Sequence, residues 1–225
     1  MVDFTYTAHT GCMGTRDNSV ESIEAAVAVG ADIVEFDLNF TSSGEPVLAH
    51  DIPKGGEVTL DEAFRLVSQY DEIKVNVDIK STVALYKVLP LAEKYGVADR
   101  IFFTGVNDEF LDAVRAEGKG VPYYLNVDVK PESKHSAEYL ESVVDKVKQS
   151  GAMGINFNKD NASSELVEAF HCNGLLVSIW TVDTEYDMHR ILSYAPDNIT
   201  TRKPDKLKEV IKNRYQEVNY GNRAF

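Results

Sequence analysis

The stretch GADIVEFDLNF, residues 30–40, has the alternation of a buried strand with one apolar and one polar face. Side chains along a strand point to opposite sides in turn. One face of this stretch is therefore apolar and consists of Val34, Phe36 and Leu38. The opposite face carries Glu35 and Asp37, two carboxylates that are costly to bury unless they are paired or bind a cation. The pattern predicts a strand that packs its apolar face against helices and turns its carboxylates toward a site.

Strands of this kind alternate with amphipathic helices along the whole chain. Runs of β-branched and aromatic residues predict strands near 4–10, 32–39, 74–80, 101–106, 121–128, 154–158, 176–182 and 198–202. Capping residues and helical periodicity predict helices near 19–29, 59–70, 82–95, 108–118, 136–149, 163–173, 184–194 and 204–217. Repeated strand–helix units without a linker predict an α/β fold, a (β/α)8 TIM barrel, that forms a single domain over residues 1–225. An open doubly wound sheet is the structural alternative, but at this length it usually has fewer repeats.

Charge and composition restrict the partners of the chain. It has 36 acidic and 23 basic residues and a formal net charge of -13, so we expect neither nucleic acid nor an anionic membrane surface as its main partner. No apolar run reaches the ~18 residues of a membrane span, and the start MVDFTYTAH lacks the layout of a secretory signal. We therefore expect no transmembrane segment and a cytoplasmic location. Cys12 and Cys172 match no disulfide framework or zinc spacing, and the sequence leaves the oligomeric state open.

A third carboxylate is expected beside the first two. In a barrel of parallel strands, the active site lies at the mouth formed by the carboxyl ends of the strands. Asp78, in the strand near 74–80, belongs to the inward-facing set and is expected at the same height as Glu35 and Asp37. Three carboxylates completed by water and substrate suit a hard divalent cation, Mg²⁺ or Ca²⁺. The structural alternative is that these acids pair with lysines and cap the barrel end.

Two histidines are expected at the same mouth. His9 ends the first predicted strand in TAHTG, and His50 follows a hairpin-like segment, TSSGEPVLAHD, that leaves the second. Imidazole titrates near neutral pH, so two such side chains can share general acid and general base catalysis. A lone histidine is more often structural, but two of them beside a group of carboxylates favour a catalytic role.

The motifs also occur in a recognisable order along the chain. The segments AHTG, DNS, GADIVEFDLNFTSSGEPVLAHD, VNVDIK, IWTVD and TTRKPDKL follow one another. This order resembles the glycerophosphodiester phosphodiesterase family, whose usual pattern is His-Arg-Gly, Glu-Asn-Thr, Gly-Ala-Asp-x-(Ile/Val)-Glu-x-Asp-Val, Thr-x-Asp-Gly-x-Pro-Val-x-His-Asp, Glu-x-Lys and Thr-Asp-x-Pro. The chain resembles a short form, because only IPKGGEV follows Asp51 where members usually carry a long insertion.

The resemblance implies a barrel phosphodiesterase that hydrolyses a glycerophosphodiester, a small-molecule substrate, to glycerol 3-phosphate and an alcohol. It implies His9 and His50 as the catalytic acid and base. It also implies one divalent cation, Mg²⁺ or Ca²⁺, held by Glu35, Asp37 and Asp78, the last of which stands where the family usually has glutamate.

The resemblance further suggests residues that contact the substrate. Lys80 would contact the phosphate, and Trp180 would line the substrate pocket. Thr10 stands where the family has an arginine suited to phosphate oxygens, and Arg16, on the same loop, is the candidate to compensate for it. Asn18 would brace this first loop, or serve only as a helix cap.

Two other functions remain open at this level. Asp78 and the short loop after Asp51 also resemble the sphingomyelinase D and phospholipase D-like enzymes of spider venom, in which a substrate hydroxyl attacks the phosphorus and a cyclic phosphate forms. Alternatively, the loss of the arginine at position 10 would mark a barrel that binds phosphodiesters without turnover. The chain lacks the disulfide-bearing loop expected of the secreted venom enzymes, which places that reading second. The intact histidines, strand carboxylates and Lys80 favour hydrolysis over binding alone.

Overall fold

The predicted strand–helix repeats close into a barrel. The computed structural model describes residues 4–221, in which parallel strands pair in chain order and the last of them, β9, pairs with the first, β1. The barrel strands are β1 Thr5–Ala8, β2 Ile33–Phe40, β4 Lys74–Ile79, β5 Ile101–Val106, β6 Tyr123–Asn126, β7 Gly154–Asn158, β8 Leu176–Trp180 and β9 Asn198–Thr201. The predicted TIM barrel is therefore confirmed, and the open doubly wound sheet is wrong.

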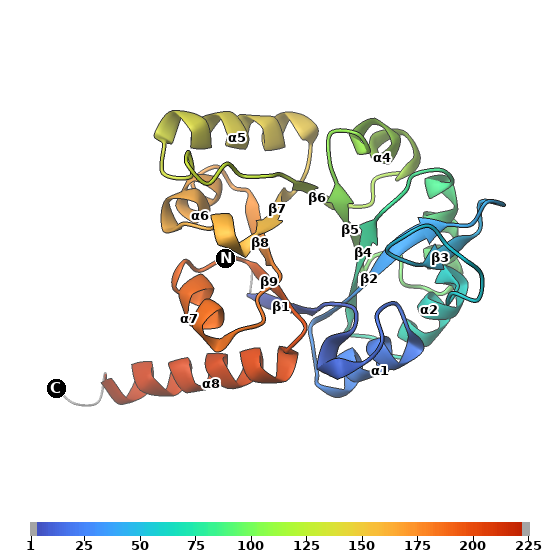
Figure 1. Cartoon of the computed structure of the whole chain (residues 1–225), viewed down its shortest axis with the longest axis horizontal. Helices are drawn as coiled ribbons and strands as arrows, with labels where there is room; N and C mark the ends of the chain where they lie inside the picture. Colours follow the sequence, from blue (N-terminus) through green and yellow to red (C-terminus); the bar gives the residue numbers. More distant parts are fainter. Residues whose placement is uncertain (1–3, 222–225) are drawn as a thin grey trace.

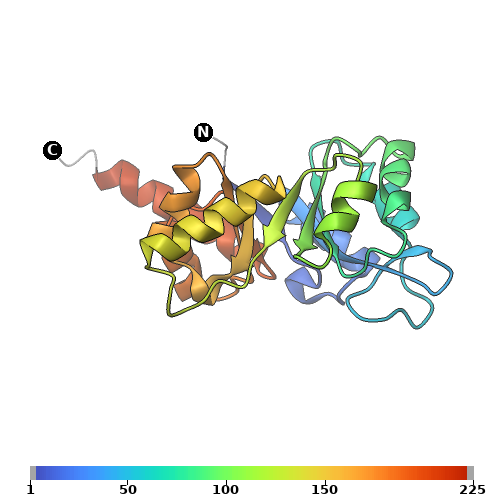
Figure 2. The same cartoon turned by 90° about the horizontal axis from the view of Figure 1, so that it is seen from above.

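Helices surround the ring of strands, as Figure 1 shows. They are α1 Val20–Ala28, α2 Leu60–Val67, α3 Val88–Lys94, α4 Leu111–Glu117, α5 Ala137–Ser150, α6 Ser164–His171, α7 Glu185–Ser193 and α8 Pro204–Gly221, with short 3₁₀ turns at Cys12–Gly14, Leu85–Lys87 and Lys159–Asn161. Figures 1 and 2 both place α8 and the hairpin that follows β2 at opposite ends of the molecule. None of the helices in the described residues is long and apolar enough to cross a membrane.

Two local details differ from the predicted elements. The hairpin-like segment after β2 forms a short strand, β3 Pro46–Leu48, that pairs antiparallel with β2. The helix predicted near 82–95 is split into a 3₁₀ turn and α3. A continuous helix would need a backbone donor at Pro90, and α3 begins late enough to put this proline in its first turn, where no donor is required.

The two faces of β2 and β4 meet different surroundings, as the alternation predicts. The apolar face of β2 is buried against the helices, and the Phe36 ring lies 6.3 Å from the ring of Phe64 in α2. On the inner side, Ile33, Phe102 and Tyr124 form a separate apolar cluster inside the barrel. This level of the barrel interior is thus apolar beside β2, β5 and β6, whereas beside β1, β8 and β9 it contains the hydrogen-bonded polar side chains of Thr7, Ser178 and Asn198.

Gly105 allows β5 to pack closely against β4 beside Asp78. β5 has an irregular register against β6 at this point, and Gly105 has a φ of 72°. A Cβ at this residue would lie 2.4 Å from the carbonyl oxygen of Ile79 and 3.0 Å from Oδ1 of Asp78. Only glycine allows β5 to approach β4 so closely with this backbone conformation.

Candidate active site

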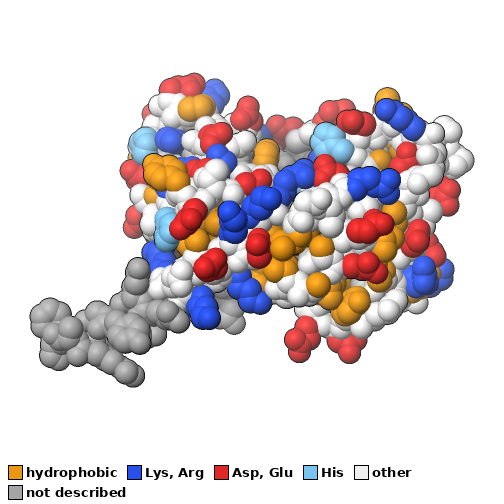
Figure 3. All heavy atoms as spheres, turned by 60° about the horizontal axis from the view of Figure 1, so that its bottom comes forward, with side chains coloured by type: hydrophobic (Ala, Val, Ile, Leu, Met, Phe, Trp, Pro, Cys, Tyr) orange, Lys and Arg blue, Asp and Glu red, His pale blue; other side chains and the backbone are white. Residues whose placement is uncertain are grey.

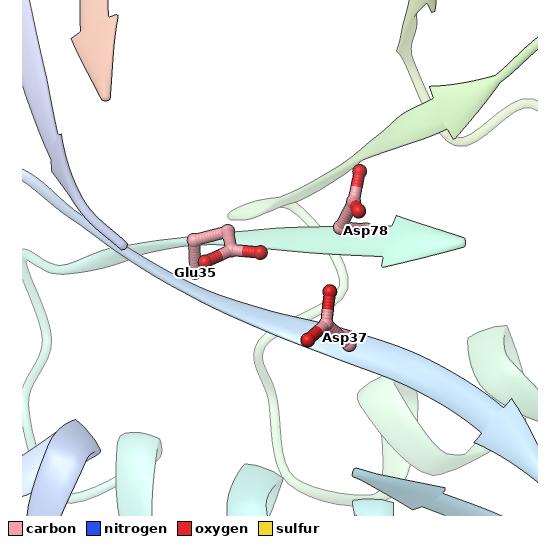
Figure 4. Close-up of side chains that lie close together, drawn as sticks. All are labelled: Glu35, Asp37 and Asp78. Carbon is pink, nitrogen blue, oxygen red and sulfur yellow. The ribbon is translucent and has the colours of Figure 1, made fainter. Parts of the chain in front are cut away.

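Three carboxylates converge at the carboxyl end of the barrel. In the register of β2 and β4, Asp37 lies directly opposite Asp78, and Glu35 lies one inward position earlier, opposite Asn76. Parallel strands in register hold such side chains at the same height. Figure 4 shows the carboxylates of Glu35, Asp37 and Asp78 close to one another, and ligand atoms of the three lie within 4.8 Å of one another. The structure therefore brings together the three residues that the sequence predicts as a cation site.

The carboxylates are buried with too little positive charge to balance them. Glu35 and Asp37 are each 4% exposed. Lys80 Nζ lies 2.6 Å from Asp78 Oδ2 and 3.1 Å from Asp37 Oδ1, so the lysine pairing that the sequence leaves as an alternative does occur. One ammonium nevertheless faces three carboxylates, which leaves an excess of two negative charges when all are ionised. A divalent cation would cancel that excess, and the all-oxygen donor set suits Mg²⁺ or Ca²⁺.

The same imbalance shifts the ionisation of two groups. Desolvation raises the pKa of Glu35 to about 7, and the charges of Asp37 and Asp78 add to this effect, while His9 and the backbone N–H of Thr10 oppose it. Burial acts to lower the pKa of Lys80, but the charges of Asp78 and Asp37 outweigh it, so that this pKa is raised above its ordinary value. Lys80 is therefore a permanent cation, whereas Glu35 carries its charge only at a cost unless a cation is nearby.

The loop after β1 holds the carboxylates in place through hydrogen bonds. Asn18 Nδ2 donates to Asp37 Oδ2 over 2.7 Å, and the backbone N–H of Asp37 donates to Asn18 Oδ1 over 2.9 Å. The backbone N–H of Thr10 donates to Glu35 Oε2 over 2.7 Å. Ser19, not Asn18, caps α1, because its side chain accepts from the backbone N–H of Ser22. The side chain of Asn18 is thus used to orient a carboxylate rather than to begin a helix.

Both predicted histidines reach the same cavity. His9 Nδ1 lies 2.8 Å from the carbonyl oxygen of Thr10 and 3.7 Å from Glu35 Oε2, so both neighbours of this nitrogen are acceptors. His50, on the loop after β3, is 67% exposed, and its Nδ1 lies 3.0 Å from Asp51 Oδ1. Acceptors beside Nδ1 favour the tautomer with the proton on that atom, which leaves Nε2 of each ring available for proton transfer.

These groups line one cavity of about 500 Å³, to which Lys80 and Trp180 also contribute. Two predicted substrate contacts are placed elsewhere. Thr10 is 2% exposed and lies behind the cavity wall, where its Oγ1 accepts a hydrogen bond from the backbone N–H of Asn18. Arg16 is exposed and is not part of the wall formed by the described residues.

Arg202 and Asp17 are part of the cavity wall, and the sequence reasoning missed both. Arg202 is the last residue of the strand predicted near 198–202, so it lies at the carboxyl end of a barrel strand. The rule that identified His9 at the end of the first strand would have identified it too. Asn156, an inward-facing residue of β7, also lines the cavity and donates a hydrogen bond to Asn126 Oδ1 over 3.0 Å.

On the face drawn in Figure 3, acidic and basic side chains are interspersed. The net charge of -13 is therefore not gathered into one patch on that face. Binding of an anionic ligand therefore depends on the charged residues that line the cavity rather than on the net charge of the protein.

Solved structures share this barrel. A glycerophosphoryl diester phosphodiesterase described as putative, from Silicibacter pomeroyi, superposes with a TM-score of 0.79 at 19% identity, over 95% of this chain and 94% of that one. A phosphodiesterase from Oleispira antarctica, solved in complex with the product sn-glycerol-3-phosphate, superposes with a TM-score of 0.73 at 18% identity, over 92% and 96% of the two chains. At these identities the likeness establishes the fold.

Sequence comparison identifies the family. A glycerophosphodiester phosphodiesterase of Caldanaerobacter subterraneus subsp. tengcongensis is 26% identical over 248 residues, which cover 91% of this chain and 96% of the relative. A lysophospholipase D of Mus musculus is 19% identical over 92% of this chain and 85% of its own length. The model of the glycerophosphoryl diester phosphodiesterase family matches residues 7–80 and 59–206, which together span most of the sequence. The chain belongs to the glycerophosphoryl diester phosphodiesterase family.

Proposed function

We propose that this protein is a metal-dependent hydrolase that converts a glycerophosphodiester into glycerol 3-phosphate and an alcohol. The observation that carries the proposal is the meeting of His9 and His50 with the Glu35, Asp37 and Asp78 carboxylates in one cavity. The family match, the names of the relatives and the product bound to the Oleispira antarctica structure support the same chemistry.

Glu35, Asp37 and Asp78 would hold one divalent cation, either Mg²⁺ or Ca²⁺. The fit rests on the donor set and on the excess negative charge that Lys80 leaves uncompensated. When bound, such a cation would polarise a phosphoryl oxygen and offset the charge that develops on the phosphorus substituents. Lys80 would keep Asp37 and Asp78 together and add a fixed positive charge to the floor of the cavity.

His9 is assigned as the general base. Its Nδ1 proton faces the carbonyl oxygen of Thr10 and the Glu35 carboxylate, so the lone pair of Nε2 is free to accept a proton from the attacking water. As that proton leaves, the water oxygen forms the new bond to phosphorus. The Glu35 carboxylate, 3.7 Å from Nδ1, stabilises the positive charge that the ring then acquires.

His50 is assigned as the general acid. It is on the more exposed side of the cavity, where the alcohol part of the substrate would point toward solvent. When the bond between phosphorus and the alcohol oxygen breaks, Nε2 of the protonated ring gives its proton to that oxygen. Asp51, 3.0 Å from Nδ1, would hold the ring in the required orientation. The sum of the two proton transfers is addition of one water across the ester bond.

Trp180 would form one side of the substrate pocket. Its ring lines the cavity, and its buried Nε1 has no hydrogen-bond partner among the described residues. Because Nε1 is buried, the ring would meet the substrate through its apolar carbon atoms rather than through this N–H.

The purified protein should be assayed with glycerophosphocholine, glycerophosphoethanolamine, glycerophosphoinositol, glycerophosphoglycerol and a lysophospholipid. We expect turnover of at least one substrate with Mg²⁺ or Ca²⁺, loss of turnover in EDTA, and glycerol 3-phosphate as the product. Release of a cyclic phosphate would instead support the venom-enzyme type of reaction. If no substrate is turned over with either ion while glycerol 3-phosphate still binds, the barrel binds phosphodiesters without catalysis and the proposal is wrong.

A further inference from the structure

Arg202 lies beside the loop after β1, which follows His9, although it is far from that loop in sequence. It follows the last residue of β9, and its backbone carbonyl accepts a hydrogen bond from the N–H of Met13 over 3.1 Å. The preceding carbonyl, of Thr201, accepts from the N–H of His9 over 2.9 Å. The backbone N–H of Arg202 donates to Asp183 Oδ1 over 2.7 Å. The backbone of Arg202 is therefore held from two sides at the mouth of the barrel.

The guanidinium of Arg202 lies against Gly11, two residues after His9. One of its terminal nitrogens donates to Asp17 Oδ1 over 2.6 Å and the other to Asp17 Oδ2 over 3.3 Å, in a forked pair. A Cβ at Gly11 would lie 1.9 Å from Asp17 Oδ1 and 2.6 Å from the guanidinium. The Arg202–Asp17 pair thus fills the space that a side chain at position 11 would need, and both partners line the cavity.

The charge of Arg202 is the less compensated of the two permanent cations in the cavity wall. The wall formed by the described residues contains Lys80 and Arg202 as its lysine and arginine. Lys80 faces two carboxylates that are themselves buried or nearly so. Arg202 makes its one ion pair with Asp17, whose side chain is 52% exposed and therefore well screened by water, and the charges of Asp183 and Glu35 act on it without a direct ion pair. A cation in this situation retains attraction for a second anion.

The guanidinium of Arg202 has donors suited to the oxygens of a phosphodiester. A guanidinium has five N–H donors, and the pair with Asp17 uses two of them, which leaves donors for two phosphoryl oxygens. Thr10 has no charge, and neither Thr10 nor Arg16 is part of the cavity wall formed by the described residues.

We propose that Arg202 is the phosphate-binding arginine of this active site and that Asp17 is the positioning residue that holds its guanidinium toward the cavity. The inference rests on the proposed function for the identity of the substrate. It places the phosphate-binding arginine at the end of β9, whereas the sequence analysis expects it on the loop after β1.

The test compares Arg202→Ala, Arg202→Lys and Asp17→Asn with Arg65→Ala, which removes an exposed arginine on α2 outside the cavity. Each variant is assayed for kcat and KM, for binding of sn-glycerol 3-phosphate by calorimetry in the presence of Mg²⁺, and for thermal unfolding. We expect Arg202→Ala to lose about 100-fold or more in kcat/KM and to bind sn-glycerol 3-phosphate at least about 10-fold more weakly. Arg202→Lys should recover part of this loss, because it keeps the charge but not the fork.

Two further measurements separate phosphate binding from a merely structural role. Millimolar guanidinium should raise the activity of Arg202→Ala several-fold and leave Arg65→Ala unchanged. Asp17→Asn should lose much less activity than Arg202→Ala, since the guanidinium is still present. Equal losses in the two variants, together with equal falls in their unfolding temperatures, would show that the pair only braces the loop, and would overturn the inference.

The failure of this inference is distinguishable from failure of the proposed function. If the wild type is active and Arg202→Ala behaves like Arg65→Ala, the function stands and the inference is wrong. The same holds if Arg16→Ala, rather than Arg202→Ala, loses activity and binding. If the wild type has no turnover but its binding of sn-glycerol 3-phosphate depends on Arg202, the inference stands and the hydrolase function is wrong.

Discussion

Replacing Glu35 with glutamine is expected to stabilise the metal-free protein at alkaline pH, although the change removes a proposed metal ligand. Glu35 is 4% exposed, and its desolvation, with the added charges of Asp37 and Asp78, raises its pKa from 4.5 to about 7. In the unfolded chain the same carboxyl has its ordinary pKa. Between these two values the folded state keeps a proton that the unfolded state has released.

The sign and size of the effect follow from this difference. The stability that the bound proton provides is complete below about pH 4.5 and is lost as the pH rises through about 7. Each pH unit between the two pKa values corresponds to about 1.4 kcal/mol, so the metal-free wild type should lose on the order of 3 kcal/mol by pH 8. Glutamine has no charge to desolvate and can still accept the hydrogen bond from the backbone N–H of Thr10.

The free energy of unfolding should be measured by urea titration in EDTA at pH 5 and pH 8 for the wild type, Glu35→Gln and the control Glu24→Gln, an exposed residue of α1. The difference between the wild type and Glu35→Gln reports the titration of Glu35 together with its coupling to His9. We expect Glu35→Gln to gain about 3 kcal/mol on the wild type between the two pH values, and the control to gain nothing. Added Mg²⁺ should stabilise the wild type and not the variant. A difference that does not change with pH would refute the argument that Glu35 is desolvated beside uncompensated charge.

Four other substitutions test the catalytic pair and the packing that supports it. His9→Ala and His50→Ala should each lower kcat at least about 100-fold while Mg²⁺ affinity, measured by calorimetry, changes little; near-normal turnover by either variant would contradict the acid–base pair. Gly105→Ala should lower the free energy of unfolding by at least about 2 kcal/mol, since the residue has a φ of 72° and the new Cβ would lie 2.4 Å from the Ile79 carbonyl oxygen; an unchanged urea midpoint would show that β5 can move away. Phe64→Ala should cost about 3–5 kcal/mol in the same measurement because the ring is fully buried under the barrel; a cost below about 1 kcal/mol would mean that the helix layer collapses onto the gap.

The carboxylate site could be predicted because it depends on local stereochemistry. Alternation along residues 33–40 and 74–79 determines which side chains share a face, whatever the rest of the chain does. Once the repeats indicated a barrel of parallel strands, the inward polar positions of β2 and β4 had to meet at one height, as the opposition of Asp37 and Asp78 shows. The start of α3 was missed for a reason equally local, the missing donor of Pro90, which the helical periodicity concealed.

The contact between Arg202 and Asp17 beside the loop after β1 could not be predicted in this way. Arg16 is seven residues from His9 and was the natural candidate to replace the charge missing at Thr10, yet the turn that leads into α1 leaves its side chain exposed. Arg202 is 185 residues from its partner Asp17, and the two meet because β9 pairs with β1 when the barrel closes. Side-chain alternation and strand order can be predicted from the sequence because they follow from neighbouring residues. The place of Arg202 at the end of a strand follows from neighbouring residues too, but its contact with Asp17 depends on closure of the barrel, which joins the two ends of the chain and has no local signature.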